Sequence, residues 1–177
     1  MKKAIIYISL IIVFILIYLL QASFFTSFTI AGVMPNLIVI LMLFIGLYMG
    51  RSLGIIYGII FGSFVDIWIG RSLGITSVGL ALIGFLSGIF DKNFSKDSRM
   101  TIILMSAICT IVFEVVVYIF KYFMIGINIE IISFLKILGI EVFYNILLTT
   151  ILYPLINKAG NEVESEIKGD KIFTRYF

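Results

Sequence analysis

The sequence predicts an all-α, polytopic membrane protein with about six transmembrane helices. Apolar residues make up 62% of the 177 residues and charged residues only 13%, against about 45–50% and about 25% in soluble domains. The mean hydropathy is +1.20. A soluble domain of this size could not bury so much apolar surface and still cover itself with polar groups. At about 20 residues per span, six spans need roughly 120 residues and leave no room for a folded soluble domain.

The first two spans are predicted within the long uncharged run between Lys3 and Arg51. They cover 4–22 and 34–50, and a Gln-Ala-Ser break and a Ser/Thr patch separate them. Lys2 and Lys3 before an apolar run also resemble the start of a signal peptide. The run is long for that purpose and lacks a good small-residue cleavage site, which favours an uncleaved first span.

The other four spans are separated by turns that contain charged residues or glycine. They are predicted at 52–67, 72–90, 100–123 and 134–157. Span 3 is short, and a re-entrant segment in place of two full spans is the alternative for 51–91. Polar residues follow the last span, so the chain divides into one transmembrane domain, 1–157, and a short tail, 158–177.

The basic residues favour an orientation with both ends of the chain in the cytoplasm. With the N-terminus inside, ten of the thirteen Lys and Arg residues fall on the cytoplasmic side. The three at the outer side are Arg71, Lys121 and Lys136. Cytoplasmic loops carry the excess of Lys and Arg in membrane proteins, so this distribution predicts six spans with a cytoplasmic tail.

A series of glycines at a spacing of four marks the second and third spans. It comprises Gly46, Gly50, Gly54, Gly58 and Gly62, and Asp66 continues it. Span 4 has a shorter series, Gly84 and Gly88. A spacing of four places residues on one helix face, and glycine lets helix backbones approach closely within a membrane. The series therefore predicts helix packing within the chain, and docking of a partner helix is the alternative.

Polar residues form a stripe on each of the last two spans. Span 5 has Thr110, Glu114, Tyr118 and Lys121, and span 6 has Glu141, Asn145 and Thr149. A charged residue at mid-membrane costs about 2.5–3.5 kcal/mol, so each one needs a physical reason. At 1.5 Å per residue, both glutamates lie roughly 10–12 Å below the outer helix ends, and Asp66 falls near the outer end of span 3.

Two interpretations of these polar residues remain open. The acids pair with nearby bases, since Lys121 is seven residues after Glu114 and can extend outward from the same face. Alternatively, Glu114, Glu141 and Asn145 line an outward-facing polar cavity or a groove for a partner helix. Asp66 and Tyr118 complete this set of candidate residues.

The chain offers no residue set for catalysis, for a cofactor or for a metal. It contains no histidine, which removes Ser-His-Asp and Cys-His sites and His-ligated metals. The single cysteine, Cys109, lies in an apolar run and is more typical of packing. Nothing in the sequence indicates a nucleic-acid partner.

These features resemble the bacterial rod shape-determining protein MreD family. The informative residues are Pro35, Asn36 and Leu37 at the start of span 2, the glycine series up to Gly62 with Asp66 after it, Leu73 and Gly74, and Gly84. Length, six spans, the charged loop after span 4 and the short tail also fit. The family often has a proline before the Leu-Gly pair, where this chain has Ser72.

The resemblance implies a non-enzymatic membrane scaffold of the cell-elongation machinery in the bacterial cytoplasmic membrane. MreD-like proteins associate with MreC, a single-span protein with an extracytoplasmic domain. They act with the actin-like MreB and a SEDS-type peptidoglycan polymerase. The implied role is to support peptidoglycan synthesis and rod shape, with the glycine and polar faces as candidate docking surfaces.

The resemblance also implies a distant fold kinship with the substrate-binding membrane subunits of energy-coupling-factor vitamin transporters. Such a subunit is the alternative function. Those proteins typically carry an Ala-x-x-x-Ala motif on span 1 for docking the coupling subunit. The first span here, from Ala4 to Ala22, lacks that motif, which favours the scaffold.

Overall fold

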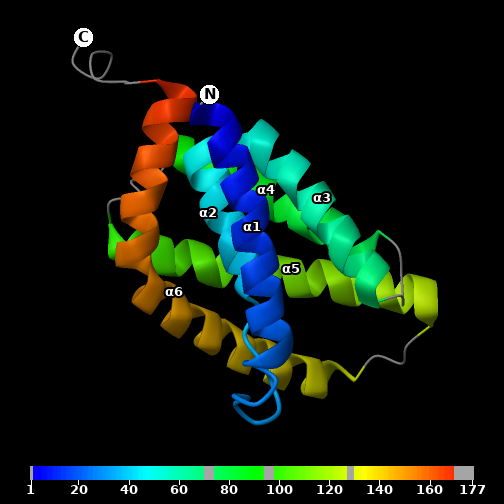
Figure 1. Cartoon of the computed structure of the whole chain (residues 1–177). Helices are drawn as coiled ribbons and strands as arrows, with labels where there is room; N and C mark the ends of the chain where they lie inside the picture. Colours follow the sequence, from blue (N-terminus) through cyan, green and yellow to red (C-terminus); the bar gives the residue numbers. More distant parts are fainter. Residues whose placement is uncertain (1, 70–73, 94–97, 127–129, 170–177) are drawn as a thin grey trace.

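The computed structural model is a bundle of six α-helices (Figure 1). It describes residues 2–69, 74–93, 98–126 and 130–169, and no strand is assigned among them. The helices are α1 (Lys2–Ser23), α2 (Leu37–Met49), α3 (Arg51–Ile69), α4 (Ile75–Asn93), α5 (Arg99–Ile125) and α6 (Ile131–Lys168). This confirms the predicted all-α fold with six helices.

Four of the described helices are long and apolar enough to cross a membrane on their own: α1, α3, α5 and α6. The other two, α2 and α4, are shorter apolar helices. The prediction that the third span is the short one is wrong. Helix α3 has 19 residues, and α2, with 13, is the shortest helix. The chain is a polytopic membrane protein.

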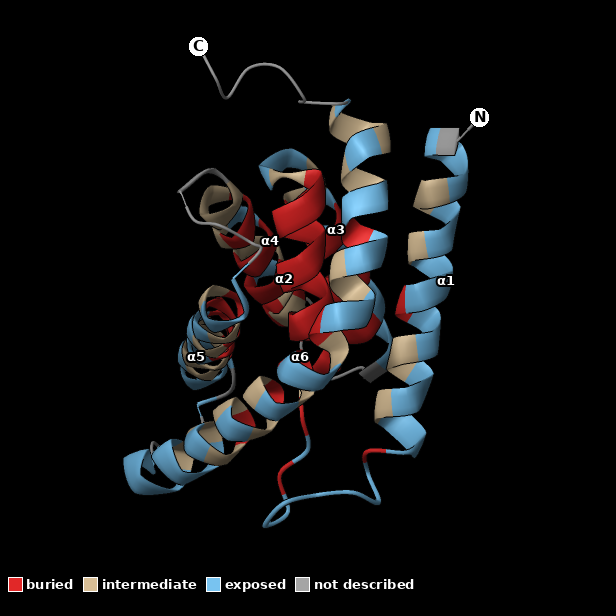
Figure 2. Ribbon diagram, turned by 90° about the vertical axis from the view of Figure 1, so that its left-hand side faces the viewer, coloured by how far each residue is buried: buried red, intermediate tan, exposed pale blue. Residues whose placement is uncertain are grey.

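The short helix α2 forms the centre of the bundle. All 13 of its residues are buried, and it contacts each of the other five helices. Figure 2 shows it surrounded by the remaining helices, whose outer faces are exposed. A helix that is apolar on every side is stable only when it is enclosed, and the run from Leu37 to Met49 supplies only apolar side chains and one glycine, apart from Tyr48.

Helices α3 and α4 pack with their backbones almost in contact. A Cβ atom added at Gly58 would lie 2.5 Å from the Cα and N atoms of Ala81. Gly54 faces Gly84 across the same interface, and Gly62 faces Ser77. The four-residue spacing thus puts the smallest residues along the line of closest approach. The neighbouring glycines make comparable contacts, Gly46 with Ser87 and Gly84, and Gly88 with Arg51.

Gly50 has a different task, because it ends α2 and begins the turn into α3. Its φ angle of +88° is a conformation that side chains with a Cβ rarely adopt. A Cβ there would meet only the end of Lys168 at 3.9 Å. Backbone geometry, and not close packing, explains this glycine.

Helix α1 lies at the edge of the bundle. Phe14 is its buried anchor, and its ring stacks on that of Phe61 of α3 with the centroids 4.0 Å apart. Most of the other large side chains of α1 are exposed. In a membrane such a surface faces the lipid chains.

Helix α6 extends beyond the predicted end of the last span at 157. It continues to Lys168, with Pro154 inside it, so the residues after 157 do not form a separate tail up to that point. The added turns pack on the bundle: Gly160 lies against the ring of Tyr48, and Lys168 pairs with Asp91 at 2.6 Å. These contacts stabilise the last turns of α6, which the polar sequence after 157 did not predict. Arg71 and residues 170–177 lie outside the described residues.

The α3–α4 interface gives a first prediction. Gly58→Ala places a methyl group against the backbone of Ala81 and should lower the free energy of unfolding by about 1–3 kcal/mol. Gly139→Ala is the matched control, because a Cβ there meets nothing within 4 Å and should raise stability by up to about 1 kcal/mol. Unfolding of both variants in detergent, followed by circular dichroism, measures the difference. Equal stability of the two variants would contradict the proposed packing.

Candidate functional site

A network of polar side chains surrounds the start of α2. With 13 residues the helix is about 20 Å long, shorter than the roughly 30 Å of a bilayer's hydrocarbon core. Its first N–H groups have no partners within the helix and, in a lipid environment, need acceptors from the protein. Asn36 precedes the helix, and its Oδ1 accepts a hydrogen bond from the Val39 N–H at 3.3 Å.

Two other helices supply acceptors for the next N–H groups. The Asn36 N–H donates to Oδ1 of Asn145 on α6 at 2.8 Å, and the Leu37 N–H donates to Oε1 of Gln21 on α1 at 3.0 Å. Asn145 is fully buried. The start of α2 is therefore held by side chains from both ends of the sequence.

The network continues from α6 to α5. The Asn145 Nδ2 donates to the Thr110 hydroxyl at 2.9 Å, and that hydroxyl donates to the Ser106 carbonyl oxygen at 2.9 Å. The hydroxyl groups of Ser106 and Thr149 lie 2.8 Å apart. All these side chains are buried. The polar stripes of the two last helices face each other, and the hydrogen bonds between them join α5 to α6.

Glu114 and Glu141 meet next to this network. Their carboxyl groups lie close enough to each other, to the side chain of Asn36 and to Lys121 for electrostatic interaction. Glu141 is buried, with 6% of its surface exposed, and Glu114 is partly buried. The structure thus brings together three of the sequence-predicted candidates, Glu114, Glu141 and Asn145.

Tyr118 lies one turn further along α5. Its ring stacks on Phe134 of α6 with the centroids 4.1 Å apart. Its hydroxyl oxygen is buried and has no hydrogen-bond partner in the described part of the chain. A buried hydroxyl normally has a partner, so this group has spare hydrogen-bonding capacity.

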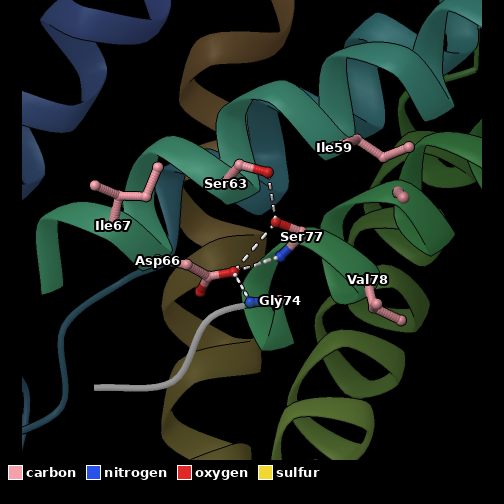
Figure 3. Close-up of a pocket in the computed structure, with 8 residues that line it drawn as sticks. Ile59, Ser63, Asp66, Ile67, Gly74, Ser77 and Val78 are labelled. Carbon is pink, nitrogen blue, oxygen red and sulfur yellow. Dashed lines mark hydrogen bonds between the residues drawn. The ribbon is translucent and has the colours of Figure 1, made fainter. Parts of the chain in front are cut away.

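Asp66 has a different location and a defined task. Its Oδ2 accepts the Gly74 N–H at 3.0 Å, the Ser77 N–H at 3.1 Å and the Ser77 hydroxyl at 3.2 Å (Figure 3). Its Oδ1 accepts the Thr76 N–H at 3.1 Å. It therefore caps the start of α4 from the neighbouring helix α3. The structure does not bring Asp66 into the cluster of Glu114 and Glu141.

Sequence reasoning did not assign Asn36 and Gln21 to the site. Pro35 and Asn36 before an apolar run are a helix-start signal, since asparagine is favoured at that position. Gln21 is the only strongly polar residue near the end of span 1, and its pairing with a backbone group 16 residues later could not be read from spacing. Among the described residues no group of three or more His, Cys, Asp or Glu could hold a metal ion.

The fold and this network define a polytopic, all-α membrane protein whose polar residues lie between helices and connect them. Its residues 2–161 match the family described as rod shape-determining protein MreD. The chain belongs to this family and is a rod shape-determining membrane protein. No curated protein and no solved structure matches it.

The α5–α6 hydrogen bonds give a second prediction. Thr149→Val keeps the side-chain shape but removes the contact with Ser106, and it should cost about 0.6–1.7 kcal/mol, as for interhelical hydrogen bonds in membranes. Thr150→Val is the control, because the exposed Thr150 hydroxyl bonds only to the Ile146 carbonyl of its own helix. Unfolding in detergent should show little change for the control. Equal losses of stability in the two variants would show that the contact between Ser106 and Thr149 does not stabilise the protein.

The Asp66 cap gives a third prediction. Asp66→Ala removes the acceptor for three backbone N–H groups at the start of α4 and should lower stability by about 2 kcal/mol, the upper value for loss of a helix cap. Asp66→Asn retains one oxygen acceptor and should lose less. Hydrogen exchange of the first α4 amides in detergent micelles reports the local effect. Unchanged exchange in Asp66→Ala would contradict the capping assignment.

Proposed function

We propose that this protein is a non-enzymatic scaffold of the bacterial cell-elongation machinery. In this proposal it binds an MreC-like single-span protein within the cytoplasmic membrane and supports peptidoglycan synthesis and rod shape. Membership of the rod shape-determining family supports the cellular role. Through that assembly the protein would also associate with an MreB-like filament and a SEDS-type polymerase complex.

The pair Glu114 and Glu141 is the observation that carries the proposal of a partner. Two carboxyl groups contain four oxygen atoms, and in the described part of the chain their electrostatic neighbours are each other, Asn36 and Lys121. The N–H groups of Asn36, Leu37 and Val39 at the start of α2 take their acceptors from amide side chains and not from these carboxyls. The cluster therefore has more acceptor capacity than the start of α2 requires. A partner helix with hydrogen-bond donors or a basic side chain would use the surplus.

The arrangement of the helices supports the proposed orientation. The start of α1 and the end of α6 lie at the same end of the molecule (Figure 1). Arg51 at the start of α3 lies against Gly88, and Lys168 pairs with Asp91, so basic residues from two distant regions of the sequence lie near the end of α4. An excess of basic residues is typical of the cytoplasmic side.

Co-purification tests the proposal. The protein is expressed with the MreC-like protein of its own genome, and retained partner is measured for the wild type, for Glu114→Leu/Glu141→Leu and for Glu162→Leu. Glu162 is an exposed residue of the same helix as Glu141 and serves as control. Retention should fall about tenfold or more in the double variant, the effect of roughly 1.4 kcal/mol, and stay unchanged in the control.

Three outcomes would overturn it. Wild-type protein that retains no MreC-like partner would refute the scaffold, and co-purification with an ATPase pair or a bound small molecule would favour the transporter subunit. Full retention by a folded double variant would show that the partner binds elsewhere. Size-exclusion profiles and helix content of each variant establish that it is folded.

A further inference from the structure

A cavity lies between α3 and α4 beside the Asp66 cap. Its volume is about 490 Å³, which is within the range of about 300–1,000 Å³ typical of ligand pockets. Ile59 and Ile67 of α3 and Val78 of α4 form its sides. Ser63, Ser77 and Ala81 are the small residues between them, so the close approach of the two helices leaves a hollow on their outer side (Figure 3).

The polar groups of this cavity already have partners. The hydroxyls of Ser63 and Ser77 lie 3.0 Å apart, and Asp66 accepts four hydrogen bonds from the start of α4. The remaining lining is aliphatic or glycine. An occupant would therefore meet an apolar surface with no donor or acceptor in need of a partner, which favours a hydrocarbon over a polar ligand.

The cavity opens on a surface that faces lipid. Ile59 is 49% exposed and Ile67 69%, on a helix long and apolar enough to cross the membrane. Trp68, the only tryptophan of the chain, follows directly and is 71% exposed. Tryptophan is enriched where hydrocarbon and head groups meet, so this end of the cavity lies near the head-group level.

We infer that the α3–α4 cavity holds one acyl chain of a bilayer phospholipid, with its head group beside Trp68. A partner helix is less well matched, because the glycines of α3 that would let such a helix approach closely face α4 instead. Gly58 lies against Ala81, and Gly62 against Ser77. This lipid site is separate from the carboxyl cluster of the proposed scaffold function.

Photo-crosslinking in a membrane tests the site. The full chain is reconstituted in vesicles of phosphatidylglycerol and phosphatidylethanolamine that contain a phospholipid with a diazirine on its acyl chain. Labelled residues are mapped by mass spectrometry. Ser63 and Ala81 are only partly exposed, whereas Ile56 of α3 is 50% exposed and does not line the cavity. Random collision would label Ile56 more than Ser63 or Ala81. An acyl chain bound in the cavity should label Ser63 and Ala81 about five times as strongly as Ile56.

Two matched variants complete the experiment. Ala81→Leu fills the cavity and should reduce labelling of Ser63 about fivefold. Ala107→Leu makes the same change at a partly buried position of α5 and should leave it unchanged. If the labelling of wild-type residues simply increases with their exposure, the inference is overturned. This test needs only the wild type and holds even if Ala81→Leu does not fold. Loss of labelling when an MreC-like span is added, with that span crosslinked to the cavity instead, would identify a helix site and also overturn it.

Discussion

The start of α2 in the protein interior is the constraint on which the rest of the structure depends. A helix of 13 residues is too short to bring both ends to the membrane surfaces, so its first N–H groups must find acceptors inside the protein. Gln21 of α1 and Asn145 of α6 supply them. Because these acceptors come from the first and the last helix, satisfying one helix end also fixes how the bundle closes around α2.

The same constraint explains why the start of α4 depends on α3. Asp66 provides four hydrogen bonds to that helix start, and its helix is held close by glycines that let the two backbones meet. Removing the cap would leave polar backbone groups in an apolar setting, and removing the glycines would move the cap away from its target. Close packing and hydrogen bonding are thus two parts of one interaction.

Much of this architecture could be predicted from the sequence, because apolar runs and the spacing of four translate directly into helices and helix faces. The glycine series indicated the face of α3 that lies against α4, and the stripes of Glu114, Glu141 and Asn145 indicated facing sides of α5 and α6. Spacing could not show that Asp66 caps a neighbouring helix, since that depends on the turn between them. It also could not show that α6 continues to Lys168, which the ion pair with Asp91 stabilises.

Comparison of the two capped helix starts separates structural polarity from polarity available to a partner. At α4 every oxygen of Asp66 is used by the helix that it caps. At α2 the N–H groups of Asn36, Leu37 and Val39 are served by amide side chains, and Glu114 and Glu141 are present in addition. Carboxyl groups at membrane depth are costly, and folding of α2 alone does not account for two of them. The proposed recognition of another membrane helix would give these carboxyls a use beyond the folding of α2.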